Sequence, residues 1–346
     1  MRIVVTGHHG YIGSITATEL VDAGHDVVGL DVFYYRGCDF GANGDGVHAF
    51  EVDVRDVGPE TLAGFDAVVH LAALSNDPLG DLNADWTYAI NLDGTVSLAR
   101  AAKEAGVERF VFASSCSMYG AATENDLLTE EAPLRPLTPY AESKVRAEAA
   151  LLELADDDFS PVFMRNATAY GVSPRLRLDV VLNNLAAWAH TTGRIRLLSD
   201  GSAWRPLVHV KDIARATGAI LAAERETVHA QALNIGSEAQ NVRIRDLAGT
   251  LHGILDCDVE MSDDATPDPR SYRVDFGKLR RALPEFRCEW TAERGAEELV
   301  EAYRRHGLTY EEFQESGRYT RLAQLKRLLR DDEVDDALRR RVRPPS

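Results

Sequence analysis

The chain has 346 residues, of which 45% are hydrophobic and 27% charged, a composition typical of a globular protein with one large or two closely joined domains. Its formal net charge of −17 argues against nucleic acid or an anionic membrane as the principal partner, because both would repel such a surface. An anionic small molecule would therefore have to meet a local cluster of arginines.

The cysteines and the length of the apolar runs indicate the cellular compartment in which the protein is expected. The four cysteines are scattered, without a C-x-x-C or Cys/His cluster, so neither a metal site nor a disulfide framework is indicated: Cys38, Cys116, Cys257 and Cys288. We expect reduced thiols and a cytoplasmic protein. The first expected strand begins at about residue 2, which leaves no room for a targeting peptide, and no apolar run approaches the ~20 residues that span a bilayer.

A glycine-rich turn follows the first expected strand. The stretch TGHHGYIG, Thr6 to Gly13, lies between an apolar run at 3–5 and a helical pattern at 11–23. Gly7 would allow a tight turn, Gly10 a close approach of a pyrophosphate, and Gly13 close packing of helix on sheet, while the helix N-terminus offers free N–H donors. The spacing is G-x-x-G-x-x-G rather than G-x-G-x-x-G, so the turn alone is a weak signal of a dinucleotide site.

The next apolar strand, 26–33, contains a carboxylate where such a site needs one. Asp31 stands at about the separation from the glycines at which a dinucleotide site holds the adenosine ribose. A carboxylate accepts hydrogen bonds from ribose hydroxyls but would repel a 2′-phosphate, which favours NAD over NADP.

Short apolar strands and helical stretches continue to alternate along the first half of the chain. Expected strands at 47–52, 66–73, 108–115 and 161–167 alternate with expected helices at 59–64, 86–105 and 139–155. Strands separated by helices imply βαβ crossovers, so the sequence predicts an α/β fold with a doubly wound parallel sheet of the Rossmann type.

The alternation weakens after about Gly171, which suggests a division of the chain. We expect a Rossmann domain over 1–171 and a smaller C-terminal substrate-binding α/β region over 172–305, interleaved with the first. Helices at 179–191, 211–223 and 244–255 and a strand at 232–235 would build the second region. The remainder, 306–346, has interspersed charges of both signs at helical spacing and predicts a solvated, charged helical tail.

A tyrosine and a lysine at helical spacing are the first residues that indicate a reaction. Tyr140 and Lys144 are four apart in PYAESK, so they share one helix face. A tyrosine with a pKa near ~10 is a poor base at neutral pH, and a nearby lysine cation favours the phenolate. Ser115 ends an expected strand, at the sheet edge where doubly wound folds bind ligands.

Together these motifs resemble a known family. TGHHGYIG, Asp31, DVRD at 53–56, HLAA at 70–73, Asn91 in NLDGT, SSCSMYG and YAESK occur in the order found in extended short-chain dehydrogenases/reductases, and the chain resembles their NAD-dependent nucleotide-sugar epimerase/dehydratase branch from residue 1 to about 305. His8 and His9 depart from the small residues usual in that glycine loop.

The resemblance implies roles for individual residues. Ser115 would hydrogen-bond the sugar hydroxyl that is oxidised, Tyr140 would take its proton, and Lys144 would hold the nicotinamide ribose and lower the tyrosine pKa. Asn91 would fix a helix bend beside the site. The implied NAD-binding residues are Gly7, Gly10, Tyr11, Ile12, Gly13, Asp31, Asp53, Val54, Leu71, Ala72, Ala73, Asn91, Tyr140 and Lys144.

The same resemblance implies a site for the diphosphate of a nucleotide sugar. Ser115 and Ser117 would contact the sugar, while Asn166, Arg205 and Arg270 would hold the diphosphate, since guanidinium groups bind phosphate bidentately. Arg175 and Arg177 would either supplement them or be solvent-exposed charges.

The residues beside Ser115 help to choose among the reactions of the branch. The dehydratases of the branch resemble one another in having a Thr-Asp-Glu tripeptide at this position. This chain has Ser115, Cys116 and Ser117 instead, with no carboxylate. Some epimerases of the branch carry a catalytic cysteine at the position of Ser117. Cys116 is one residue away from that position, so its side chain would point to the other face of the strand, and we expect it to be a buried filler. The sequence favours a C4 epimerase acting through a transient 4-keto sugar. A dehydratase or 4-ketoreductase, and a non-catalytic NAD-binding regulator, remain alternatives.

The resemblance also suggests a homodimer. Helices at 86–105 and 139–155 would form a four-helix bundle with those of a second copy. Neither the nucleotide nor the sugar is determined by the sequence.

Overall fold

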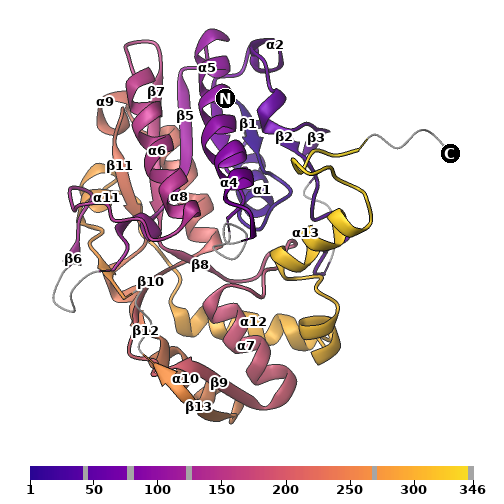
Figure 1. The fold of residues 1–346 in the computed structure, drawn as a ribbon. Helices are drawn as coiled ribbons and strands as arrows, with labels where there is room; N and C mark the ends of the chain where they lie inside the picture. Colours follow the sequence, from indigo (N-terminus) through magenta and orange to yellow (C-terminus); the bar gives the residue numbers. More distant parts are fainter. Residues whose placement is uncertain (42–45, 76–81, 122–126, 267–270, 342–346) are drawn as a thin grey trace.

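The computed structural model describes residues 1–41, 46–75, 82–121, 127–266 and 271–341 (Figure 1). Its centre is a seven-stranded sheet in which every neighbouring pair is parallel, with the order β11-β7-β5-β4-β1-β2-β3. The strands are β1 (Arg2–Thr6), β2 (Asp26–Asp31), β3 (His48–Glu51), β4 (Ala67–His70), β5 (Arg109–Ser115), β7 (Ser160–Asn166) and β11 (Ala232–Ile235). The predicted α/β Rossmann fold is confirmed.

Helices cover both faces of this sheet because its strands are apolar on both sides. Ile3 and Val5 belong to one core cluster, which includes residues of α1 and α8, whereas Val4 belongs to another, which includes residues of α5 and α6. The helices of this part are α1 (Gly13–Asp22), α2 (Pro59–Leu62), α4 (Ala84–Tyr88), α5 (Thr95–Glu104), α6 (Pro139–Leu154), α8 (Val210–Ala222) and α9 (Arg225–Val228).

A second region lies at the carboxyl edge of the sheet (Figure 1). Its small sheets pair β8 (Thr168–Tyr170), β10 (Trp204–His209) and β12 (Asn241–Arg243), then β9 (Arg194–Ser199) with β13 (Asp258–Thr266), and β6 (Leu127–Leu128) with β14 (Arg273–Val274). Its helices are α7 (Val181–Thr192), α10 (Ile244–Leu255) and α12 (Ala292–His306), whereas α11 (Gly277–Ala282) packs beside β11 of the central sheet. A third apolar cluster, with α7, α10 and α12 around Tyr303 and Leu182, holds this region together.

The expected helix at 86–105 is interrupted. A π-helical segment, η2 (Ala89–Gly94), separates α4 from α5. π-helical turns inside α-helices often mark functional sites. Three short 3₁₀ turns, η1 (Val54–Asp56), η3 (Cys116–Tyr119) and η4 (Glu238–Gln240), and a second π-helical segment, η5 (Glu311–Glu315), lie elsewhere in the chain.

The expectation of a solvated tail is wrong. Helix α13 (Arg321–Arg330) packs against the Rossmann core, where Leu325 and Leu328 are fully buried beside Val54 and Leu30. These leucines are three apart and form an apolar stripe that the flanking charges conceal in the sequence. Within the described residues, every helix is too short or too polar to span a bilayer.

Candidate active site

The carboxyl ends of the parallel strands form one wall of a cavity of about 760 Å³, and the second region forms the other. In the sheet order, β1 stands between β4 and β2, so the chain leaves the sheet in opposite directions on the two sides of β1. Ligands bind at such a switch point in doubly wound folds. The turn after β1 lies at this point and lines the cavity.

The glycines of this turn are required by close backbone contacts. Gly7 has φ +72°, and a Cβ there would lie 2.6 Å from the Ala72 nitrogen; at Gly13 a Cβ would lie 2.0 Å from the Gly7 oxygen. Helix α1 then begins without a side-chain cap and without an acidic residue in its first turn. Its N-terminal N–H groups and its positive dipole end are therefore available to a phosphate, as the diphosphate of NAD requires.

Asp31 ends β2 beside this turn. Its carboxylate accepts hydrogen bonds from the backbone nitrogens of His9 (3.0 Å) and Phe33 (2.7 Å), which fix its orientation at the cavity wall. Burial raises the pKa of Asp31, and the two backbone donors oppose that rise.

The expected adenine-side residues also line the cavity. Asp53 begins η1 and accepts hydrogen bonds from Arg55 Nε (2.9 Å) and Nη2 (2.5 Å). Although burial alone would raise it, these bonds hold the pKa of Asp53 below its usual value. Val54 and residues 71–73 line the same wall.

Asn91 lies behind the cavity rather than in its lining. It is fully buried in η2, where its side chain accepts from the Leu74 nitrogen (2.8 Å) and donates to the Leu74 oxygen (3.0 Å) and to Ser143 Oγ (3.3 Å). It thus ties the loop after β4 to helix α6. Asn91 thus lies in a π-helical interruption at the place where a helix bend was expected, but direct contact with a cofactor has no support in the geometry.

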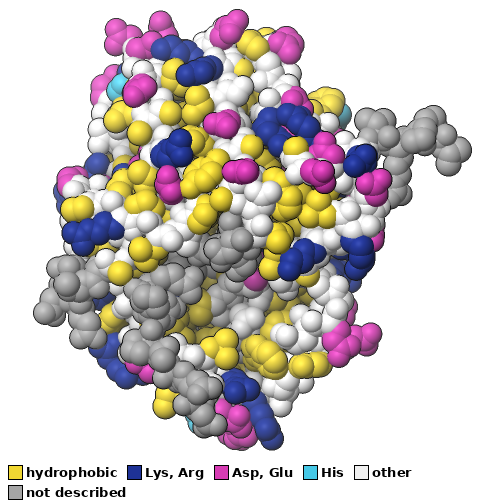
Figure 2. Space-filling model, in the orientation of Figure 1, with side chains coloured by type: hydrophobic (Ala, Val, Ile, Leu, Met, Phe, Trp, Pro, Cys, Tyr) yellow, Lys and Arg dark blue, Asp and Glu magenta, His cyan; other side chains and the backbone are white. Residues whose placement is uncertain are grey.

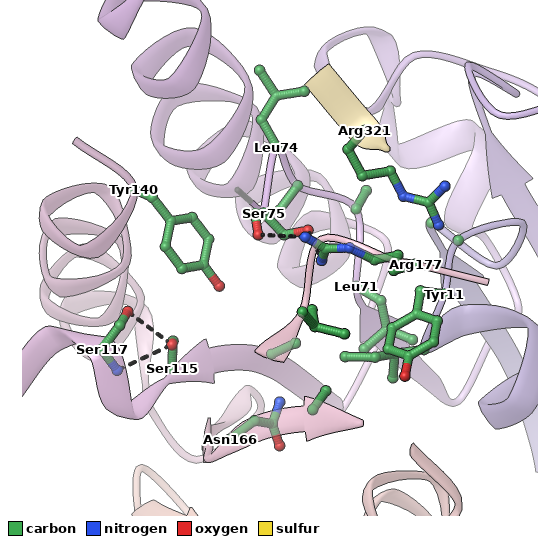
Figure 3. Close-up of a pocket in the computed structure, with 18 of the residues that line it drawn as sticks. Tyr11, Leu71, Leu74, Ser75, Ser115, Ser117, Tyr140, Asn166, Arg177 and Arg321 are labelled. Carbon is green, nitrogen blue, oxygen red and sulfur yellow. Dashed lines mark hydrogen bonds between the residues drawn. The ribbon is translucent and has the colours of Figure 1, made fainter. Parts of the chain in front are cut away.

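Ser115 and Tyr140 lie at one end of the cavity (Figure 3), and Lys144, which also lines it, stands beside Tyr140. Helix α6 begins at Pro139, capped by Thr138 Oγ1, which accepts from the Ala141 nitrogen at 3.2 Å. The Tyr140 ring extends from α6 over the end of β5, where Ser115 and Ser117 share a 2.9 Å hydrogen bond between their hydroxyls.

Lys144 lies one helical turn further along α6. Its Nζ donates to the Ala113 oxygen at 2.7 Å and stands 4.4 Å from the centroid of the Phe112 ring and 5.8 Å from that of Tyr140. Burial lowers the pKa of Lys144 to about 7. Perturbed lysines of this kind are typical of functional sites.

Cys116 is a buried neighbour of the site and not part of its lining, as expected. It is fully buried and its thiol donates to the Arg165 oxygen at 3.0 Å, and burial raises the pKa of this thiol far above its usual value.

The residues implied for a diphosphate are only partly assembled in the described chain. Asn166 and Arg205 line the cavity, and Asn166 Oδ1 is a buried acceptor without a hydrogen-bond partner among the described residues. Arg270 lies outside the described residues. Arg177 lines the cavity, with bonds to Asp179 (2.8 Å) and Ser75 Oγ (3.0 Å).

Arg175, by contrast, is not a cavity residue. It pairs with Asp39 and donates to the His9 ring, and burial together with Arg175 lowers the pKa of His9 to about 3. Arg175 and Arg177 are both buried, so the interpretation as solvent-exposed charges is wrong for both.

Sequence reasoning missed several lining residues that come from distant segments. Tyr34 and Tyr35 follow Asp31, and their place directly after the ribose carboxylate was an available signal. Arg321 comes from the C-terminal helix, and no pattern in the sequence connects it to the cavity. Among the missed residues are Tyr34, Tyr35, Ser75, Thr168 and Arg321.

Taken with the sheet order, this arrangement defines a dinucleotide-dependent enzyme of the extended short-chain dehydrogenase/reductase type. The model of the NAD dependent epimerase/dehydratase family matches residues 3–236, so the chain belongs to this family and NAD is its cofactor.

Individual relatives point the same way. The chain is 28% identical to a UDP-glucose 4-epimerase of Bacillus subtilis (strain 168) over 329 residues, covering 86% of this chain and 94% of the relative. It is 32% identical to a dTDP-glucose 4,6-dehydratase of Streptomyces griseus, covering 82% and 88%. Among solved structures, MoeE5 in complex with UDP-glucuronic acid and NAD is similar, with a TM-score of 0.77, 27% identity and coverage of 88% of this chain and 99% of that chain.

Proposed function

We propose that this protein is an NAD-dependent epimerase that acts at C4 of a nucleotide-diphosphate sugar. The observation that carries the proposal is the joint position of Ser115, Tyr140 and Lys144 at one end of the cavity, without a carboxylate beside them in the described lining. The carboxylates of that lining are engaged elsewhere: Asp31 with backbone nitrogens, Asp53 with Arg55 and Asp179 with Arg177.

The residues have distinct tasks in this reaction. NAD supplies a hydride acceptor that can return the hydride. Tyr140 removes the proton of the C4 hydroxyl as that carbon is oxidised, and gives it back when the carbon is reduced on its other face. Ser115 donates a hydrogen bond to the C4 oxygen, with Ser117 holding its hydroxyl. The Lys144 ammonium, when charged, favours the tyrosine phenolate.

The diphosphate of the substrate would meet Asn166 and Arg205 in the same cavity. A buried guanidinium attracts phosphate strongly, which supports the binding of an anion by a protein of net charge −17. A carrier of the UDP or dTDP type is in keeping with the relatives named above.

A nucleotide-sugar dehydratase is the strongest alternative, because the Streptomyces griseus relative carries that name. It would need an acid and a base near C5 and C6, and the described residues around Ser115 offer hydroxyls and a buried thiol instead. A 4-ketoreductase would need reduced cofactor in each cycle, and a regulator would not need Tyr140.

The decisive experiment is mass-resolved chromatography after incubating the purified protein, without added cofactor, with a panel of nucleotide sugars. A product of unchanged mass and altered retention supports the epimerase and names its substrate. Loss of water or carbon dioxide, or turnover only with added reduced cofactor, refutes it in favour of a neighbouring reaction.

Replacing Tyr140 by phenylalanine tests the assignment of the base. We expect Tyr140→Phe to lower kcat by about 10²- to 10⁴-fold while NAD still binds, because only the proton-transfer group is lost. Tyr310→Phe, at an exposed position, is the matched control and should retain full activity. Unchanged turnover in Tyr140→Phe would rule out Tyr140 as the base and leave the regulator interpretation standing.

We also propose a cytoplasmic homodimer. All four cysteines are free thiols in the structure, in keeping with a reducing compartment.

Helices α4, α5 and α6 lie side by side on one face, and α6 carries Leu152 with 52% of its surface exposed. Figure 2 shows hydrophobic side chains interspersed with charged ones on the face of the molecule seen in Figure 1. A four-helix bundle formed with a second copy would cover the helical face. Light scattering that shows a monomer at micromolar concentration would exclude the dimer.

A further inference from the structure

The last described part of the chain, residues 320–341, is called here the C-terminal segment. It begins with α13 and runs along the Rossmann domain beside β2 and β3 (Figure 1). Leu325, Leu328 and Leu338 are fully buried in the same cluster as Leu30 and Val54, which flank the expected adenosine site. Burial of three leucines shows that the segment belongs to the folded core at this position.

The segment is bonded to the two loops that carry Asp31 and Asp53. In the loop after Asp31, the carbonyl oxygens of residues 32–34 all accept hydrogen bonds from the C-terminal segment. Arg340 donates to Val32 (3.1 Å) and Phe33 (2.5 Å), and Gln324 donates to Tyr34 (2.9 Å). The Tyr34 hydroxyl donates in turn to the Leu338 oxygen.

After Asp53, the bonding is similar. Arg55 donates to the Ala337 oxygen at 2.8 Å, and Arg339 pairs with Asp56 at 2.5 Å. The C-terminal segment therefore fixes both loops that face the adenosine end of the cavity.

Arg321, the first residue of α13, reaches into the cavity itself. Its side chain lines the cavity at the end away from Tyr140 and Ser115 (Figure 3). The guanidinium carbon lies 3.9 Å from the centroid of the Tyr35 ring, and Nη2 donates to the Arg175 oxygen at 2.8 Å. The residue is only 3% exposed, yet Nη1 has no hydrogen-bond partner among the described residues.

The charges around Arg321 compensate its guanidinium only in part. Arg175 is paired with Asp39, and Arg177 with Asp179 at 2.8 Å. Asp179 also accepts from the Arg321 backbone nitrogen at 3.4 Å, so Arg321 and Arg177 share this carboxylate. Burial lowers the pKa of Arg321, which means that its charge is held in an unfavourable environment. A buried cation with an unused donor is strongly unfavourable unless a ligand completes its hydrogen bonds and neutralises its charge.

We propose that Arg321 binds the diphosphate of NAD across the cavity from the glycine turn, and that the C-terminal segment acts as a clasp that retains the cofactor. The substrate's diphosphate is a poorer candidate, because Arg321 lies on Tyr35, four residues after the ribose carboxylate Asp31, and far from the Ser115 end. A retained cofactor suits a reaction that returns its hydride in every cycle. The proposal rests on NAD binding alone and survives if the epimerase assignment fails.

The test compares Arg321→Gln with Arg330→Gln on the purified full-length protein. Arg330 lies on the same helix, and its side chain is 73% exposed. We expect Arg321→Gln to raise the Kd for NAD by about 10- to 100-fold and to lower the NAD content after purification, while the Kd for adenosine, which has no diphosphate, changes less than about twofold. Arg330→Gln should match the natural protein for both ligands.

Other outcomes refute the proposal. An unchanged Kd for NAD in Arg321→Gln would remove Arg321 from the site, and an equal loss for NAD and adenosine would show a merely structural role. If Arg321→Gln fails to fold, Arg321→Lys keeps the charge and should weaken NAD by a smaller factor, again without affecting adenosine. Arg340→Ala tests whether the C-terminal segment retains NAD. It should speed NAD dissociation several-fold, and an unchanged dissociation rate would overturn the proposal that the segment acts as a clasp.

Discussion

His70 shows how the polar groups beneath the cofactor site are satisfied. Its Nε2 lies 2.8 Å from Thr95 Oγ1, and its Nδ1 lies 2.6 Å from Thr6 Oγ1. Because the Thr95 hydroxyl donates its proton to the Asn91 backbone oxygen, it must accept from Nε2–H, which leaves Nδ1 as the acceptor of the Thr6 hydroxyl. The imidazole is thus neutral, and burial lowers the pKa of His70 to about 3.

This pKa predicts a specific loss of stability in acid. Between about pH 6.5 and pH 3 the unfolded chain binds a proton at His70 that the folded protein does not bind, so the free energy of unfolding falls as the pH falls through this window. From pH 6.5 to pH 4.5 the contribution is about 2 kcal/mol. Denaturant unfolding at both pH values should show that His70→Gln loses about that much less than the natural protein. Parallel losses would contradict the assignment.

The proposed catalytic residues were accessible to sequence reasoning because their pattern is local. Tyr140 and Lys144 stand four apart on one helix, and Ser115 ends a strand whose apolar pattern is plain. Arg321 was not accessible, since it meets Tyr35 across more than half the chain and its nearest sequence neighbours, Thr320 and Leu322, belong to no recognisable motif. Residues that join a site through long-range packing leave no periodic signal.

At the scale of elements, strongly patterned segments were predictable and their interruptions were not. The expected helix at 244–255 and strand at 232–235 coincide with α10 and β11, but β11 pairs with β7 in the central sheet and not in the second region, where it was expected. The π-helical turn at Asn91 has no counterpart in the apolar periodicity, because it depends on contacts with Leu74 and Ser143. Likewise, the apolar stripe of α13 is buried only because the Rossmann core provides a surface against which it packs.

Two glycines on neighbouring helices offer a matched test of the glycine turn. Gly13 begins α1, and a Cβ there would meet the Gly7 backbone at 2.0 Å, whereas a Cβ at Gly218, inside α8, would have no atom within 4 Å. We expect Gly13→Ala to lose NAD binding and several kcal/mol of stability, because the backbone of the turn must move. Gly218→Ala should gain about 0.5–1 kcal/mol from helix propensity.

Thermal unfolding and NAD titration of both variants measure these effects. Near-normal NAD affinity in Gly13→Ala would show that the turn can shift without harm, and would weaken its assignment as the phosphate-binding element. A loss of stability in Gly218→Ala would contradict the open space at that position and would remove it as a control.

At the scale of the whole molecule, the cavity joins three parts of the chain that are far apart in the sequence. Residues of the glycine turn, residues 166–169 and 179–181 with Arg177, and Arg321 line it, so a ligand that fills it bridges the sheet, the second region and the C-terminal segment. A ligand that binds only the folded state stabilises it by about 2.7 kcal/mol at a hundred times its Kd. Bound NAD should therefore stabilise the molecule, but not evenly.

We expect removal of NAD to lower the unfolding temperature by several degrees and to speed amide hydrogen exchange in two places, the glycine turn with the start of α1 and helix α13. Helix α10 contributes no residue to the cavity lining in the described chain, so its exchange should stay unchanged and serves as the internal control. Exchange followed by mass spectrometry, with and without NAD, makes the comparison. A change confined to the glycine turn would mean that α13 packs independently of the cofactor, because a segment that clasps NAD must lose protection when NAD leaves.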